Sequence, residues 1–90
     1  MSDAYEVVFT RSARRALEQD LPEKVAAAAF EFIMGALRDN PRRVGKQLRG
    51  PLAPLYAARR GDYRVGYRTI ENRLVIDVVS IVHRRDAYCP

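Results

Sequence analysis

The sequence contains one cysteine, one histidine and no tryptophan. The lone Cys89 excludes a disulfide within the chain, and with a single histidine it leaves too few ligands for a zinc site. No apolar run approaches the roughly 20 residues that cross a bilayer. The N-terminal residues also lack the basic start and apolar stretch of a signal peptide. We therefore expect a cytoplasmic protein with no metal, no cofactor and no membrane contact.

The length and composition are those of a small globular protein. The chain has 90 residues, of which 48% are hydrophobic and 30% charged. Typical domains have about 100–150 residues, so a second domain does not fit. We expect one domain that spans residues 1–90.

Positive charge dominates and is concentrated in the second half of the chain. Of the 16 basic residues, 14 are arginines, against 11 acidic residues. Residues 1–40 carry five basic and seven acidic residues (net −2), whereas residues 41–90 carry eleven and four (net +7). A GC-rich genome would explain arginine over lysine, but not this segregation. A basic half favours a polyanion or an acidic partner, and arginine binds phosphate through a planar fork.

The first forty residues predict a strand followed by a helical hairpin. A β-rich segment covers residues 5–9, and Thr10 or Ser12 caps a first helix. Pro22 suits the first turn of a second helix that ends near Arg38. The apolar stripe expected on that helix is Ala26, Phe30, Ile33 and Leu37.

The second half predicts a loop and then three strands. Residues 41–54 have the prolines, glycines and basic residues of a loop, which we expect Val44 and Leu48 to pin to the body. The strands expected are 55–60, 63–70 and 73–83, joined by turns at Gly61–Asp62 and Glu71–Asn72. The order β-α-α-β-β-β predicts an α+β fold with a helical hairpin on a small antiparallel sheet. Because the apolar face of the helices is expected to pack against the chain's own sheet, we expect the free chain to be a monomer.

Strand alternation separates the arginines from the core. The residues expected to face the helices are Tyr63, Val65 and Tyr67, and those expected on the opposite, open face are Arg64, Gly66 and Arg68. One of Arg59 and Arg60 must share the face of Arg64. On the last strand, strict alternation groups Leu74, Ile76, Val78, Ser80 and Val82, and on the other face Val75, Asp77, Val79, Ile81 and His83.

The arginine cluster on the open face has two interpretations. It is either a solvated face whose charges are paired by aspartates, or a surface that binds phosphate groups. Metal-free RNA cleavage by the ribose 2′-hydroxyl needs a base, cations for the charge on the phosphorus centre, and an acid. Arginines supply the cations, His83 titrates near neutrality, and Tyr88 is able to stack on a base or carry a proton.

Three stretches together resemble the RelE toxins of bacterial type II toxin–antitoxin systems. They are NPRRVGKQLR from Asn40 to Arg49, ARRGDYRVGYR from Ala58 to Arg68, and VHRRDAY from Val82 to Tyr88. The resemblance implies a RelE-like fold and an mRNA interferase that cuts the codon in the ribosomal A site without metal.

The family's motif implies a role for several residues of this chain. Arg64 would hold the scissile phosphate, Arg84 would be the cation near the leaving group, and Tyr88 would stack on or deprotonate the substrate. His83 stands where related toxins have a basic residue. The residues expected to bind RNA phosphates are Arg59, Arg60, Arg68, Arg85, Lys46 and Arg49.

The sequence departs from the family at the strand before the hairpin, where well-studied members carry lysines and this chain has Tyr56-Ala-Ala-Arg-Arg60. ParE toxins share the scaffold but inhibit DNA gyrase, so gyrase inhibition is the alternative activity. A catalytically weak toxin that acts mainly as a co-repressor is another. The partners implied are a small acidic, RelB-like antitoxin in a hetero-oligomer, and the ribosome with its mRNA.

Overall fold

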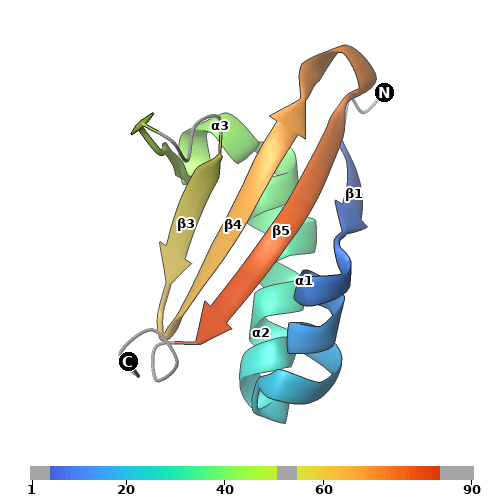
Figure 1. Cartoon of the computed structure of the whole chain (residues 1–90), viewed down its shortest axis with the longest axis vertical. Coiled ribbons are helices and arrows are strands. Elements are labelled where there is room, and N and C mark those ends of the chain that lie inside the picture. The colour runs from blue at the N-terminus through green and yellow to red at the C-terminus, as the bar shows by residue number, and fades with distance from the viewer. Residues whose placement is uncertain (1–4, 51–54, 84–90) are drawn as a thin grey trace.

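The computed structural model of the chain describes residues 5–50 and 55–83. A five-stranded sheet, in the order β1-β5-β4-β3-β2, forms one layer, and the helices cover one of its faces (Figure 1). The strands are β1 (Glu6–Phe9), β2 (Lys46–Gln47), β3 (Tyr56–Arg60), β4 (Tyr63–Ile70) and β5 (Val75–His83). This arrangement confirms the α+β fold and the helical hairpin expected from the sequence.

The hairpin consists of two helices that each end in wider, π-type turns. The helical segments are α1 (Arg11–Arg15) with its continuation Ala16–Asp20, and α2 (Glu23–Phe32) with its continuation Ile33–Leu37. Thr10, rather than Ser12, caps α1, because its hydroxyl accepts a hydrogen bond from the Ala13 amide at 3.2 Å. None of the described helices is long and apolar enough to cross a membrane.

The core lies between the helices and the central strands. Ile33 and Leu37 from the second helix meet Val65 and Tyr67 of β4, and none of these side chains is exposed. The stripe expected on α2 is partly wrong: Phe30 is 48% exposed and stacks on Phe9 of β1, with ring centroids 6.2 Å apart. Phe30 lies over the edge strand, where the sheet ends, so Ala29 and Phe32 fill the core instead.

The sheet is mixed, whereas the sequence predicts an antiparallel one. β1 runs parallel to β5, with Val7 opposite Ile76, while the other strand pairs are antiparallel. The N-terminal strand therefore joins the sheet beside the C-terminal strand. The start of β1 is held beside β5 by the Glu6 amide, which donates a hydrogen bond to the Leu74 carbonyl at 2.8 Å.

The basic segment expected as a loop contains regular structure in its described part. A short helix, α3 (Pro41–Val44), and strand β2 follow one another, so the loop prediction is wrong there. Val44 is exposed and does not pin the segment. The anchor is the Tyr67 hydroxyl, which donates to the Pro41 carbonyl, with Gly45 so close that a Cβ there would clash with it.

Of the two turns that join the last three strands, only the first places a glycine at a positive φ. Gly61 has a φ of +59°, as a two-residue hairpin between β3 and β4 requires. The second turn is a short 3₁₀ segment, Glu71–Arg73, and it is followed by Leu74 with a φ of +54°. Leu74 is 43% exposed and precedes β5, so the strand begins later than the residue 73 expected from the sequence.

Candidate phosphate-binding face

The arginines of β4 lie on the face of the sheet that the helices leave open. Tyr63, Val65 and Tyr67 are buried against the helices, as predicted, while Arg64 and Arg68 are exposed on the opposite face. This exposed side of the sheet is called the open face below. It is built on paired strands, which hold the backbone of each arginine in place.

The register of the β3–β4 hairpin decides which neighbouring arginine joins Arg64. Arg59 pairs directly with Arg64, and side chains of directly paired residues lie on the same face. Their Cα atoms are therefore about 4.5–5.5 Å apart. Neither guanidinium forms an ion pair with another described residue. Two like charges directly opposite destabilise a sheet, so this pair is electrostatically poised for an anion.

Arg60 lies on the other side of the sheet. It pairs with Tyr63, and its guanidinium carbon stands 5.0 Å from the ring centroid of Phe32 on α2. A hollow of about 540 Å³ lies between α2 and the β3–β4 hairpin, and its lining includes Arg60, Tyr63 and Phe32. This hollow belongs to the helix-covered side and is separate from the open face.

Small residues form the floor of the open face between its charged rows. Ala57, Gly66 and Ser80 lie side by side on β3, β4 and β5. A Cβ at Gly66 would come within 2.7 Å of the Ser80 hydroxyl oxygen, so a larger residue there would require the Ser80 side chain to move. The alternation of β4 places Gly66 on the face of Arg64 and Arg68, which leaves the space between these two arginines unobstructed.

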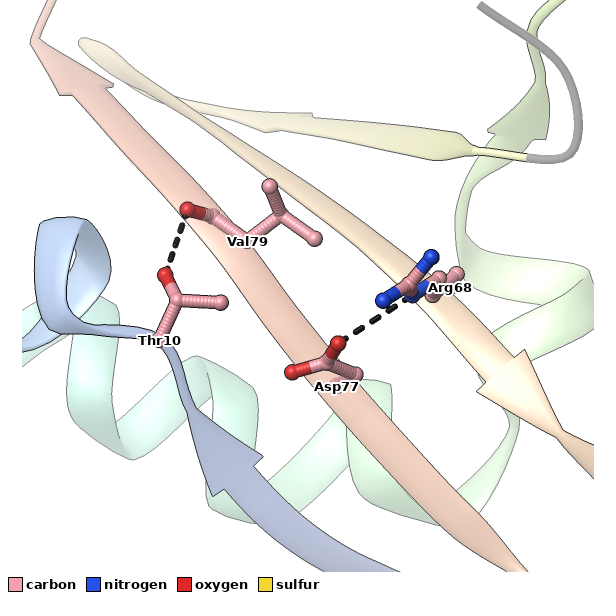
Figure 2. Close-up of polar contacts among 4 residues, drawn as sticks. All are labelled: Thr10, Arg68, Asp77 and Val79. Carbon is pink, nitrogen blue, oxygen red and sulfur yellow. Dashed lines mark hydrogen bonds and ion pairs between the residues drawn. The ribbon is translucent and has the colours of Figure 1, made fainter.

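A bulge in β5 overturns the simple alternation predicted for that strand. Gly66 pairs with Ser80 but Tyr67 pairs with Val78, so Val79 is an extra residue. The Thr10 hydroxyl donates to the Val79 carbonyl at 2.8 Å and holds the bulge in place (Figure 2). A glycine inside a strand is a recognised sign of a bulge, so Gly66 was the available signal.

The bulge changes which β5 residues share the open face. Ile81 now points into the core with Ile76 and Val78, so the predicted alternation is wrong beyond Val78. Val82 pairs with Arg64 and lies on the open face, whereas His83 pairs with Tyr63 on the helix-covered side. His83 is half-buried at the end of its strand. The register thus does not bring His83 onto the face of Arg64.

The charge of Arg68 is neutralised by an ion pair, whereas Arg64 forms no ion pair with another described residue. Its Nε donates to Asp77 Oδ2 at 3.1 Å across β4 and β5 (Figure 2). Among the described residues this is the one ion pair on the open face. The solvated-face interpretation thus holds for Arg68, and the cations at the Arg59–Arg64 end remain available.

Two more predicted cations come from the segment after α3. Lys46 pairs with Ala57, which places it on the open face at the sheet edge. Arg49 is exposed just beyond β2. The predicted site residues Arg84, Arg85 and Tyr88 lie outside the described residues. The described part of the chain contains no cluster of side chains suited to a metal ion.

Tyr63 and Tyr67 belong to the buried side of the sheet and not to the open face. Burial raises the pKa of Tyr67 to about 12, partly offset by the hydrogen bond from Gly45. Burial also raises the pKa of Tyr63, against the lowering effect of Arg60. Both side chains are therefore neutral hydrogen-bond donors at physiological pH, and neither is a base for chemistry on the open face.

The sequence matches a known family over most of its length. A family model described as the ParE toxin of the type II toxin–antitoxin system parDE covers residues 7–88. The chain is 46% identical over 90 residues to the Toxin RelE of Mycobacterium tuberculosis (strain ATCC 25618 / H37Rv), covering 98% of this chain and 92% of that protein. Toxin RelG of the same organism is 44% identical over 84 residues, covering 93% and 95% respectively.

Solved structures share the fold described above. The toxin–antitoxin complex RelBE2 from Mycobacterium tuberculosis contains a chain that is 43% identical, with a TM-score of 0.86 and coverage of 90% of this chain and 99% of that one. An archaeal RelE–RelB complex from Pyrococcus horikoshii contains a chain 30% identical, with a TM-score of 0.69 and coverage of 90% and 96%. These matches extend across both the sheet and the helical layer.

Proposed function

The chain belongs to the ParE toxin family of type II toxin–antitoxin systems, and from that premise we propose that it is a ribosome-dependent, metal-independent mRNA endoribonuclease. Its similarity to proteins named RelE places it on the RelE side of this family. The proposed substrate is the mRNA codon in the ribosomal A site, and the proposed outcome is the arrest of translation.

The observation that carries this proposal is the directly opposed pair Arg59 and Arg64 on the open face. Two guanidiniums on one rigid sheet, with no ion pair to another described residue, provide positive charge in a fixed position. A phosphate that becomes pentacoordinate gains negative charge, and prepositioned cations stabilise that charge most in the transition state. Arg64 is the proposed ligand of the scissile phosphate, and Arg59 supplies the charge that lysine supplies in related toxins.

In the proposed reaction, the ribose 2′-oxygen forms a bond to phosphorus while the bond from phosphorus to the 5′-oxygen breaks. A base takes the 2′-hydroxyl proton, and an acid gives a proton to the leaving 5′-oxygen. No external water or metal is required. Tyr88 is the proposed stacking residue or base, and Arg84 the proposed cation near the leaving group.

His83 is the remaining candidate for proton transfer. Its place at the end of β5, across from Tyr63, makes it a flanking group rather than a neighbour of Arg64. We therefore assign the first cationic role to Arg64, and we propose His83 as a proton carrier only if the substrate extends past the end of the strand. A His83→Gln variant that keeps full cleavage would remove it from the scheme.

Dependence on the ribosome follows from the kind of contacts that the open face offers. Cations bind the phosphate backbone without selecting a base sequence. Exposed aromatic side chains for stacking are absent from the described part of the open face. The proposal is therefore that the ribosome presents the message and so selects the cleavage site, with the activity in the cytoplasm.

We propose that the second partner is a RelB-like antitoxin. The similar chains of known structure occur in RelE–RelB complexes. Residues 41–90, which include four of the five strands, have a net charge of +7, which suits an acidic segment that folds as it binds. Such a pair would also act as a repressor if the antitoxin supplies the DNA-binding part.

Cleavage assays on translating ribosomes test the proposal directly. Arg64→Ala should reduce cleavage of ribosome-bound mRNA by about 10²–10³-fold, the usual loss when one transition-state donor is removed. Arg15→Ala is the matched control, because Arg15 is an exposed arginine of α1 on the other side of the molecule. Equal cleavage by both variants would contradict the assignment of the active site.

Gyrase inhibition is the second candidate, because the family model that matches is that of ParE toxins. A supercoiling assay with purified DNA gyrase distinguishes the two activities. Inhibition of supercoiling without cleavage of ribosome-bound mRNA would replace the nuclease proposal. Cleavage of naked RNA at the same rate as ribosome-bound RNA would contradict the A-site mechanism but keep the nuclease.

A further inference from the structure

Asp77 is the acidic residue that the register brings onto the open face beside Arg68. It lies in β5 between Arg68 of β4 and Val8 of β1, and its side chain is only 15% exposed. Its carboxylate accepts a hydrogen bond from Arg68 Nε at 3.1 Å (Figure 2). An acidic group in the middle of a surface that binds a polyanion calls for an explanation.

We propose that Asp77 sets the boundary of the polyanion-binding surface by keeping Arg68 out of it. This inference rests on the proposed function and deepens it. At the Arg59–Arg64 end a phosphate meets two cations, neither of which forms an ion pair with another described residue. At Arg68 an incoming phosphate meets a guanidinium whose charge is already neutralised by the partly buried Asp77 carboxylate.

The distance between Arg64 and Arg68 makes such a boundary effective. Arg64 and Arg68 are four residues apart on β4, which corresponds to about 13 Å along a strand. Among the described residues, the floor between them is formed by Gly66 and by the small side chains of Ala57 and Ser80. Without Asp77, the cations would form a continuous track along the sheet.

The pair joins a half-exposed arginine to a carboxylate that is mostly buried, with exposed fractions of 52% and 15%. Any contribution that it makes to stability is compatible with a second role. A charge boundary has a clear functional consequence. It weakens binding to bulk RNA, where only the backbone is available, and leaves strong binding to sites where the ribosome presents one phosphate to Arg64.

The experiment measures salt-dependent binding of the purified chain to a fluorescein-labelled oligouridine whose 2′-oxygens are methylated, so that it cannot be cleaved. Asp77→Asn keeps the size of the side chain and frees Arg68 to bind a phosphate. One additional phosphate contact should steepen the slope of log K against log salt by about 0.7 and tighten binding about fivefold near 0.1 M salt.

Two controls separate a local effect from the change in net charge. Glu18→Gln removes one negative charge from the exposed end of the helical hairpin and should leave the slope unchanged. The double variant Asp77→Asn/Arg68→Ala should return to the wild-type slope. A wild-type slope in Asp77→Asn, or an equal gain in Glu18→Gln, would overturn the proposal.

If Asp77→Asn does not fold, the single variant Arg68→Ala still tests the proposal through the salt dependence of its binding. Because Arg68 is already bound to Asp77, its removal should leave the slope within about 0.2 of wild type, where one lost contact would change it by about 0.7. A loss of a full contact would show that Arg68 binds RNA despite Asp77. The failure of Arg64→Ala to weaken binding would count against the proposed function, and not against the boundary role of Asp77.

Discussion

The two faces of β4 are built from neighbouring residues but have opposite properties. Tyr63, Val65 and Tyr67 are almost fully buried, with exposed fractions of 6%, 0% and 0%. Arg64 and Arg68 alternate with them and are exposed on the open face. One strand therefore carries both the packing that stabilises the fold and the charge that we assign to function.

From this difference we expect stability and activity to be separable in this chain residue by residue. Changes on the helix-covered face should reduce the free energy of unfolding, with loss of activity only as a consequence. Changes on the open face should reduce activity in a protein that remains folded. The predictions below test this separation, in order of their expected effect on stability.

The largest effect is expected from Tyr63→Ala. The ring is buried against Phe32, with centroids 6.3 Å apart, and the hydroxyl donates to the Ala28 carbonyl at 3.2 Å. Truncation of a buried aromatic side chain typically costs about 3–5 kcal/mol, a large share of the stability of a small domain. Urea unfolding would measure it. Tyr63→Phe, which removes only the hydroxyl, should cost about 0.5–1.5 kcal/mol.

A somewhat smaller effect should appear as a pH dependence. Burial raises the pKa of Tyr67 from about 10 in the unfolded chain to about 12 in the folded protein. The neutral hydroxyl is therefore favoured by folding, so this contribution is fully present below pH 10 and is lost as the pH rises toward 12. Two pKa units correspond to a contribution on the order of 3 kcal/mol.

Unfolding measured by urea at several pH values between 9 and 12 would reveal this loss. Tyr67→Phe should be less stable at neutral pH, because the Pro41 carbonyl loses its donor, and its stability should depend less on pH in this window. An identical alkaline dependence in both proteins would show that Tyr67 does not titrate as described.

An intermediate effect is expected from Thr10→Ala. The Thr10 hydroxyl accepts from the Ala13 amide and donates to the Val79 carbonyl, so one substitution removes a helix cap and the bond that holds the bulge. Loss of an N-cap typically costs about 0.5–2 kcal/mol. Thr10→Ser keeps both hydrogen bonds and should remain close to wild type in thermal melting. Equal destabilisation by serine would assign the effect to the lost methyl group.

The smallest effect on stability is expected from Arg64→Ala. Its side chain is exposed and faces Arg59, so removal should change the free energy of unfolding by no more than about 0.5 kcal/mol. Relief of repulsion between the two arginines should make the change slightly stabilising. Thermal melting of the protein used in the cleavage assay would check this, and a large loss of stability would break the separation of the two faces.

The pattern of β4 could be predicted from the sequence because only one face of that strand has large apolar residues. The same reasoning failed for β5, whose residues are mostly apolar on both faces, so alternation alone does not fix their direction. The extra residue Val79 then reversed the expected direction of Ile81 and His83. The choice between Arg59 and Arg60 depended on the hairpin register, which only the paired strands provide.

The α3–β2 segment was missed for a related reason. Its short elements have little periodicity of their own and depend on a distant partner, the hydroxyl of Tyr67. The pairing of Arg68 with Asp77 likewise joins residues nine positions apart, on adjacent strands. Cross-strand partners of this kind follow from register, and a sequence pattern does not specify register when both faces are acceptable.

The pairing of β1 with β5 also determines when the toxin becomes complete. Thr10 and Val79 are 69 positions apart, and the protein is synthesised from its N-terminus. At about 5–20 residues per second, about 3–14 s separate these two residues during translation. β5 lies between β1 and β4. A nascent chain that ends before β5 therefore leaves β1 and β4 without the strand that both of them pair with. Products that end before β5 therefore lack the strand that links β1 to β4, and we expect them to be inactive as toxins.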